Sequence, residues 1–463
     1  MLIASAVMSL AQGGVCATDY TWMGAGGNAN WSNTGNWSPS TGYPNGSGDT
    51  VQIAAGGGST ATMDTGGMTS SLTFQRGGDF AIDGGSTLIL YGGTLTVNDN
   101  FNYTISAPLR MSSSGAFTNN GSGALTVGAI DPQGSQLTWN TSSSSDAVTG
   151  IINNATLVKS GTGTLTLSAD NTYTGKTTVS AGTLRISSDS NLGTAPGAAQ
   201  ENIVIGGQYP VLGITETMTL NAKRGITLST SGASINVAGG KTVTYDGIIA
   251  GTAGGSFSKS GAGTLILGGV NTTNSQAYAS EGKLVINSGG SIGNVIVSSG
   301  TLGGTGTAGT VAIVSGGTIM PGSADGTAYG TLTTGAETWY GGSTYDWLVA
   351  GNSGSLLDMG VNQLNLNNVT SGSRFAIKIT GTTTGTSEGQ TFTIAQYGSL
   401  SKSFASDLFT VTNNAGGYFT LSGNESHLQL TYSAVPEPSV VGLFLMSLPF
   451  VGAAGRRLCA KRR

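Results

Sequence analysis

The sequence predicts an all-β protein, a solenoid in which short strands stack coil on coil. Three observations predict it: strands separated by glycine turns, a duplicated segment, and an unusual composition. Glycine supplies 78 of the 463 residues, whereas charged residues make up 9% and hydrophobic residues 38%. A Gly-X-Y period is absent, which excludes collagen, and the aliphatic residues alternate, which favours ordered β-structure over a flexible tail.

The segment Leu157–Ile186 gives the clearest strand pattern. Apolar and β-branched polar residues alternate in Thr164–Leu167, Thr177–Val179 and Thr183–Ile186, so we expect three short strands with one face buried. Turn-forming residues occupy Asp170–Gly175, between the first two strands. The glycines that mark the turns are Gly161, Gly163, Gly175 and Gly182.

The same pattern recurs one hundred residues later in the sequence. KSGTGTL begins at Lys159 and KSGAGTL begins at Lys259, and Gly182–Ile186 corresponds to Gly282–Ile286. Units that cannot bury their own apolar face indicate a solenoid when they are repeated. Shorter echoes of the glycine-led strand occur at Gly85–Leu90, Gly93–Val97, Gly300–Leu302, Gly317–Ile319 and Gly330–Leu332.

Residues 159–184 resemble the autotransporter-associated β-strand repeat (PATR type). The two copies lie near 157–186 and 257–286, and the second resembles a degenerate copy in which Asn271-Thr272-Thr273-Asn274 replaces the Asn-Thr-Tyr-Thr-Gly turn. The resemblance implies a right-handed parallel β-helix that is exported to the surface of a Gram-negative bacterium.

Residues 1–17 are predicted to be a secretory signal peptide. An apolar run, Leu2–Leu10, precedes Val15-Cys16-Ala17, which resembles a small-x-small cleavage site. The positively charged start that such leaders have is missing, so we expect the true start upstream of Met1. Export across the inner membrane follows from this interpretation.

Residues 18–75 are predicted to form an N-terminal cap and the first coils. The segment contains Trp22, Trp31 and Trp37 among glycine, asparagine and serine. Exposed tryptophans would stack on sugar rings, whereas buried ones would close the open end of the solenoid. The cap is the favoured interpretation, and carbohydrate contact through these three rings is the alternative.

The remaining body divides into two predicted regions. Residues 76–334 consist of short strands between Gly, Asn and Ser turns, as expected for the solenoid proper. Residues 335–434 contain larger aromatic residues and longer strands, which we expect to seal the other end. The predicted fold is therefore a β-helix with capping ends.

Residues 435–463 carry a separate signal. Pro436-Glu437-Pro438 precedes an apolar run over 439–454 and a basic tail that begins at Arg456 and Arg457. The run predicts a short transmembrane helix whose arginines stay in the cytoplasm, with residues 18–434 outside. The order resembles a PEP-CTERM sorting signal, which implies recognition by an exosortase, a membrane cysteine protease, and transfer to the outer surface or extracellular matrix. A plain anchor is the alternative.

The sequence contains few of the residues that a catalytic site would need. His427 is the sole histidine, and the two cysteines, Cys16 and Cys459, lie in the terminal segments. Nucleophilic triads, zinc sites and a disulfide framework are therefore not expected. The acids that a glycosidase would need are single residues in turn contexts, where Asx turns explain them: Asp79, Asp83, Asp170 and Asp189.

The expected function follows from these points. Before Val435 the chain has thirteen basic and twenty-one acidic residues, so nucleic-acid binding is not expected. No cofactor or metal is expected either. The sequence predicts an exported, non-enzymatic, structural or adhesive surface protein that contacts envelope or extracellular polysaccharide or neighbouring proteins. A carbohydrate-binding or carbohydrate-degrading β-helix is the alternative.

Overall fold

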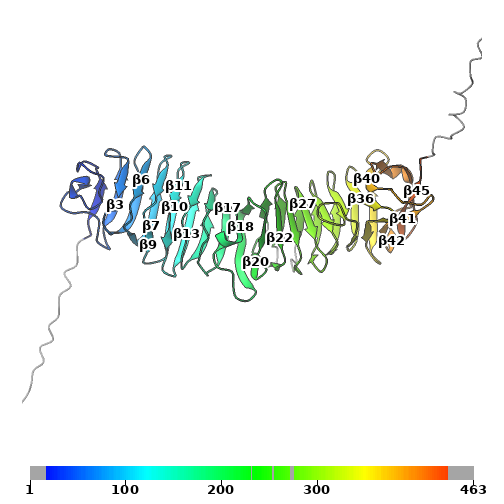
Figure 1. The fold of residues 1–463 in the computed structure, drawn as a ribbon, viewed down its shortest axis with the longest axis horizontal. Coiled ribbons are helices and arrows are strands. Elements are labelled where there is room, and N and C mark those ends of the chain that lie inside the picture. The colour runs from blue at the N-terminus through cyan, green and yellow to red at the C-terminus, as the bar shows by residue number, and fades with distance from the viewer. Residues whose placement is uncertain (1–16, 231, 253–254, 272–275, 436–463) are drawn as a thin grey trace, which may run out of the picture.

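A computed structural model describes residues 17–230, 232–252, 255–271 and 276–435. The chain forms a right-handed parallel β-solenoid of about 14 turns, drawn out into a rod (Figure 1). The predicted all-β solenoid is confirmed. Within the described part, no helix is long and apolar enough to cross a membrane. The predicted membrane helix over 439–454 lies outside the described residues.

Each coil has three faces. We define the first, second and third face by the strands that each one contains. Four long strands bend around a corner and belong to two faces, namely β5 (Gly67–Gln75), β7 (Leu88–Val97), β17 (Thr177–Ile186) and β18 (Gln200–Ile214). The first face holds the end of β5 and β7, the start of β17 and β18, and β1 (Asp19–Trp22), β3 (Thr50–Ala54), β10 (Gly115–Asn119), β13 (Gln136–Thr141), β15 (Thr156–Ser160), β20 (Arg224–Leu228), β23 (Ile249–Gly251), β28 (Ser291–Ile292), β31 (Thr307–Ala308), β34 (Thr331–Thr333), β38 (Leu356–Asp358), β41 (Thr391–Gln396), β45 (His427–Ser433) and β44 (Tyr418–Gly423).

The second face holds the end of β17 and β18 together with β4 (Thr60–Thr62), β6 (Phe80–Asp83), β8 (Tyr103–Ile105), β11 (Leu125–Val127), β14 (Asp146–Val148), β16 (Thr164–Leu167), β21 (Ala233–Val237), β24 (Phe257–Ser260), β26 (Ala277–Ala279), β29 (Val295–Val297), β32 (Val311–Ile313), β35 (Glu337–Tyr340), β39 (Gln363–Asn368) and β42 (Ser399–Leu400). The third face holds the start of β5 and β7 and then β9 (Leu109–Met111), β12 (Ile130–Asp131), β19 (Met218–Leu220), β22 (Thr242–Tyr245), β25 (Thr264–Leu267), β27 (Lys283–Ile286), β30 (Thr301–Gly304), β33 (Thr318–Pro321), β36 (Thr344–Ala350), β40 (Phe375–Thr382) and β43 (Phe409–Asn413).

The ends of the rod depart from the parallel pattern. At the N-terminal end β2 (Trp37–Ser38) pairs antiparallel with β1, next to the short helix η1 (Thr34–Asn36). At the other end β45 pairs antiparallel with both β41 and β44. The smaller elements are η2 (Asp189–Leu192), η3 (Ser406–Leu408) and β37 (Ser353–Gly354).

Coil length varies along the rod. Ile296 pairs with Ala312 only sixteen residues on, whereas Thr183 pairs with Val211, twenty-eight residues on. Part of that length lies in the corner Gly206–Pro210 of β18, whose Tyr209 is 78% exposed with a φ of 51°. At this corner the ladder between β17 and β18 shifts register twice, and regular pairing resumes on the next face.

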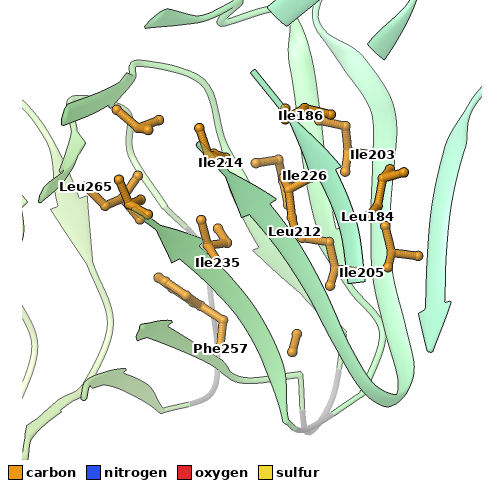
Figure 2. Packing of buried hydrophobic residues seen from close by; sticks show 14 of the residues in the cluster. Leu184, Ile186, Ile203, Ile205, Leu212, Ile214, Ile226, Ile235, Phe257 and Leu265 are labelled. Atoms are coloured by element: carbon orange, nitrogen blue, oxygen red, sulfur yellow. The ribbon is translucent and has the colours of Figure 1, made fainter. Parts of the chain in front are cut away.

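The core is a stack of inward aliphatic side chains that runs through the coils. Leu165, Leu184, Leu212 and Ile235 pair in turn on the second face, and all are buried. Figure 2 shows the later members of this stack beside the inward residues of the first face. Burial of each such side chain contributes about 1.5–3 kcal/mol, and the alternation of threonine and leucine in the sequence produces it.

One strand prediction within the repeat needs correction. Thr177–Val179 and Thr183–Ile186, predicted as two strands, are one strand, β17, which turns a corner at Gly182 with a φ of 60°. The ladder to β18 continues across that corner, which keeps the strand unbroken. In the second copy the equivalent segments are separate strands, β26 and β27.

The second copy is rotated by one face relative to the first. β15, which opens the first copy, lies on the first face beside β13. β24, which opens the second copy, lies on the second face, in the ladder that contains β16. That ladder runs from Thr164 to Thr183 and on to Val211. It then runs through Ser234 to Ser258 of β24. A hundred residues thus cover four turns and one further face.

Candidate functional site

The three tryptophans predicted from the sequence pack together inside the N-terminal end. The ring of Trp37 lies 4.9 Å from that of Trp22 and 4.7 Å from that of Trp31, both edge to face. The indole nitrogen of Trp31 donates to the carbonyl of Pro44 at 3.1 Å, and that of Trp37 to the carbonyl of Trp31 at 2.7 Å. Such edge-to-face pairs stabilise a cluster beyond the area they bury.

This burial decides between the two uses of the tryptophans. Trp22, Trp31 and Trp37 are at most 2% exposed, so no ring face is open to a sugar. The alternative of carbohydrate contact through these residues is wrong for this conformation. Their geometry is that of a cap that covers the first coil.

The lysine of each repeat copy is buried and closes a turn. Lys159 lies inside, stacked between Trp139 and Val179 of the neighbouring coils. Its ammonium donates to the carbonyls of Ser160, Gly161 and Ala181 at 2.8–3.1 Å. Burial lowers its pKa to about 8.

Lys259 repeats this arrangement in the second copy. Its ammonium donates to the carbonyls of Ser260, Gly261 and Glu281 at 2.7–3.1 Å. Burial lowers its pKa to about 8 as well. The lysine of KSG thus ties its own turn to the next coil, since one of the three acceptors lies in that coil.

The asparagine of each copy connects three successive coils. Asn171 accepts from the backbone N–H of Ile152 at 2.7 Å and donates to the carbonyl of Asn191 at 2.6 Å. Asn271 accepts from Ile249 at 2.8 Å and donates to Ser291 at 2.9 Å. These side chains form hydrogen bonds with backbone N–H and C=O groups at positions that no strand pairing covers.

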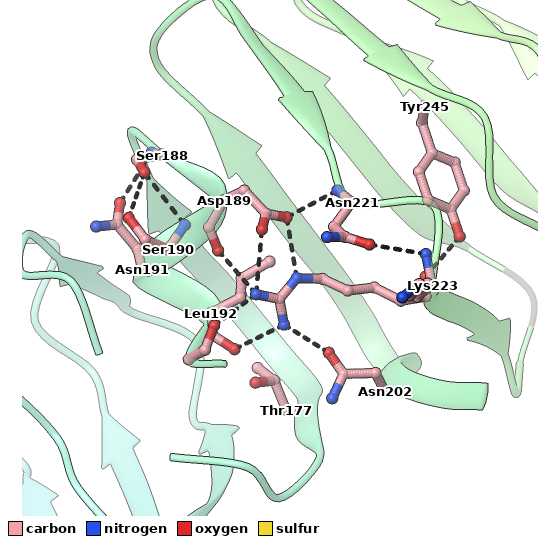
Figure 3. A network of polar contacts seen from close by, with 12 residues as sticks. Thr177, Ser188, Asp189, Ser190, Asn191, Leu192, Asn202, Asn221, Lys223 and Tyr245 are labelled. Atoms are coloured by element: carbon pink, nitrogen blue, oxygen red, sulfur yellow. Dashed lines mark hydrogen bonds and ion pairs between the residues drawn. The ribbon is translucent and has the colours of Figure 1, made fainter. Parts of the chain in front are cut away.

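A buried arginine forms the largest polar network between the two copies (Figure 3). Arg224 Nε lies 2.9 Å from Asp189 Oδ1. Its Nη1 donates to Asn202 Oδ1 at 2.8 Å and to the carbonyl of Leu192 at 3.0 Å. Nη2 donates to the carbonyl of Gly193. These bonds direct the N–H groups of the guanidinium toward acceptors within the protein. The side chain therefore holds three coils together and presents no donor to a ligand.

The buried acids are likewise held by neutral donors. Asp146 accepts from Asn119 Nδ2 at 2.8 Å and from Trp139 Nε1 at 2.9 Å. Glu337 accepts from Thr334 at 2.9 Å and from Trp339 Nε1 at 2.6 Å, and burial raises its pKa to about 7. Both carboxylates lie in the core, where no substrate reaches them.

Three of the acids singled out from the sequence bond to other parts of the chain, and the fourth, Asp83, is half-buried at the end of β6. Asp189 pairs with Arg224, Asp170 accepts from Ser190, and Asp79 accepts from the N–H of Asn102 at 2.9 Å. The described ranges contain no group of three or more His, Cys, Asp or Glu side chains that could hold a metal ion. His427 lies at the start of the end strand β45 and contacts only Ser426 and Asn424 through its ring nitrogens.

The surface offers shallow hollows on the coil faces. One of about 260 Å³ lies on the first face beside Ile226 and Ile248, and one of about 470 Å³ lies on the second face at Gly213. Another, of about 390 Å³, lies on the first face near the C-terminal end, beside Tyr329. No local pattern in the sequence predicts these hollows, because each is lined by residues from several successive coils.

The predicted sorting residues cannot be placed. Pro436, Glu437, Pro438, Arg456 and Arg457 lie outside the described residues, as does nearly all of the predicted leader.

Comparison with known proteins places part of the chain. Residues 157–186 match the family model of the passenger-associated transport repeat. An adhesin of Brucella suis biovar 1 (strain 1330), the BmaC autotransporter, is 37% identical to this chain over 141 residues. The match covers 30% of this chain and 4% of the relative, so this chain corresponds to a small part of that protein's length.

Proposed function

We propose that the chain is an exported, non-enzymatic surface rod with an adhesin-like role in a Gram-negative bacterium. The observation that carries the proposal is the parallel solenoid whose residues 157–186 match a repeat of transported passenger regions. The similarity to part of an autotransporter adhesin supports the same role.

The placement of the charged groups favours contact over catalysis. Lys159, Lys259 and Arg224 are buried and bond to neighbouring coils. Glu337 is buried as well, and its donors lie in its own coil. Enzymes place titratable groups with shifted pKa values where a substrate meets them, whereas Lys159, Lys259 and Glu337, whose pKa values burial shifts, lie in the core. The outward faces carry mainly threonine, serine and asparagine, which suit many weak polar contacts along a rod.

We further propose that the C-terminal segment directs sorting. Pro436-Glu437-Pro438 would be recognised by an exosortase-type protease while the run over 439–454 holds the chain in the inner membrane, with Arg456 and Arg457 on the cytoplasmic side. The processed chain would then reach the outer surface or the extracellular matrix.

The test of surface location is an intact mass measured on protein from fractionated native cells. We expect a mass that ends near Pro438, in the outer-surface or medium fraction. A mass that retains Arg456 and Arg457 in the inner membrane would mean a plain anchor and would contradict sorting.

The test of the adhesive role compares attachment of cells that lack the gene with complemented cells. We expect attachment to a glycan-coated or host-cell surface to fall on deletion and to return on complementation. Unchanged attachment by the deletion strain would contradict the adhesive role and leave the sorting result intact.

A further inference from the structure

The hollow beside Tyr329 is lined in part by two glycines in neighbouring coils. It lies between β34, β38 and β41 on the first face. A β-carbon on Gly354 would collide with the ring of Trp347, and one on Gly330 would lie 2.5 Å from Thr305 Cγ2. The two glycines therefore let the backbone of the lining approach Trp347 and Thr305 closely.

The lining of this hollow is neutral and mostly polar. It contains no charged side chain, and its members are Tyr329, Gly330, Thr331, Asn352, Gly354, Leu356, Gln390, Thr391, Phe392 and Thr393. Tyr329 is 48% exposed and forms one wall. The aromatic ring is therefore available beside amide and hydroxyl groups.

The polar groups are held in place by second contacts. Asn352 Oδ1 accepts from the N–H of Ser387 at 2.9 Å, which fixes the amide. The hydroxyl of Thr391 lies 3.1 Å from that of Thr431. Gln390 Nε2 donates to the carbonyl of Thr391 at 3.2 Å. A lining that is positioned before binding loses less entropy when a ligand arrives.

We infer that this hollow binds a neutral sugar unit of a glycan. A pyranose has an apolar ring face that packs on an aromatic side chain, and hydroxyls that pair with amides and threonines. An anionic sugar would find no cation in the lining, and a purely apolar ligand would leave the amides without partners. The inference rests on the proposed adhesive role and names one surface and one ligand class for it.

The test uses the full chain and a printed array of neutral and acidic oligosaccharides, followed by calorimetry on the strongest neutral binder. We expect Tyr329→Ala to weaken that binding about tenfold or more, and Tyr329→Phe to keep it within about threefold because the ring remains. The matched control is Tyr91→Ala, since Tyr91 is 49% exposed on β7, far along the rod. We expect no change in that variant.

Two results would overturn the inference. One is the absence of neutral binders on the array, or a preference for acidic ones. The other is equal affinity of the wild type and the Tyr329→Ala variant, with both shown to be folded by circular dichroism. Attachment of cells that carry Tyr329→Ala distinguishes the proposed adhesive role from the proposed sugar site. If these cells attach normally, the adhesive role stands and the hollow is not its site.

Discussion

The two repeat copies make the same contacts on different faces of the rod. Lys159 and Lys259 each close a turn through three carbonyls, and Asn171 and Asn271 each join three coils. Even the turn glycines agree, with φ of 60° at Gly182 and 61° at Gly282. The first copy nevertheless opens on the first face and the second on the second face.

This difference shows that the motif determines the local shape of a coil but not the face of the rod on which the motif begins. All of its contacts reach only the adjacent coils, as expected for a repeat protein whose units touch only their neighbours. The copies differ most at their turn, where the first has Tyr173 and the second has Thr272 and Thr273 in the sequence.

The largest expected effect comes from the aromatic residue that only the first copy has. Tyr173 is buried, and its hydroxyl lies 2.8 Å from that of Thr177. We expect Tyr173→Ala to lower the free energy of unfolding by about 3 to 5 kcal/mol because a cavity remains. Tyr173→Phe should cost about 1 kcal/mol, the value of one hydrogen bond. Urea unfolding measures both, and equal losses would show that packing is not the main term.

The asparagine pair sharpens the comparison. Asn171→Ala leaves the N–H of Ile152 and the carbonyl of Asn191 without their partner. Asn271→Ala leaves only the N–H of Ile249 without its partner, because the carbonyl of Ser291 still accepts from the backbone N–H of residue 271 at 3.0 Å. In urea unfolding we expect Asn171→Ala to cost about 2 to 3 kcal/mol, from two unsatisfied buried groups, and Asn271→Ala to cost about 1 to 2 kcal/mol, from one. A loss for Asn271→Ala that equals or exceeds the loss for Asn171→Ala would contradict this count of unsatisfied groups.

The two lysines test whether the contribution of the motif to the free energy of unfolding depends on the face on which it lies. Lys159→Met and Lys259→Met keep much of the buried stem and remove the donors to three carbonyls. We expect losses of about 1 to 2 kcal/mol that agree within about 0.5 kcal/mol, since the contacts match. Thermal unfolding of the two variants side by side measures the difference. A gap well above that margin would mean that the surrounding face sets the energy.

A further prediction concerns pH. Burial lowers the pKa of Lys159 and of Lys259 from 10.5 to about 8. Between these values the unfolded chain binds more protons than the folded chain, so the free energy of unfolding rises as pH increases from about 8 to 10. The measurement is urea unfolding at pH 7.5, 8.5 and 9.5. The double variant Lys159→Met/Lys259→Met should lack most of this rise, and an identical slope in both proteins would refute the assignment.

The solenoid was predictable because its signals are local. Alternating threonine and leucine in Thr164–Leu167 form β16 with the leucines inside, and the glycines at 161 and 182 adopt the left-handed turns expected of them. The tryptophans of the N-terminal segment pack as a cap because a first coil has no neighbour to cover it.

Features that depend on the path between coils were not predictable. A spacing of one hundred residues does not reveal the rotation of the second copy, since coil length varies from sixteen to twenty-eight residues over β16 to β32. Asp189 was expected only as a turn former, yet its carboxylate pairs with Arg224, thirty-five residues away. The hollow at Tyr329 needs three coils whose stacking no local pattern encodes.

The corner Gly206–Pro210 shows that the wall of the rod and its outward loops are independent. Ile205 pairs with Leu228 and Val211 pairs with Ser234, so the ladders on both sides of the corner stay in register while Tyr209 stands out into solvent. Loop length adds little to the entropic cost of closing such a corner. A foreign peptide grafted between Gly207 and Pro210 would therefore be displayed at one defined position along the rod axis. The protein would then serve as a scaffold that presents an epitope at a fixed distance from either end.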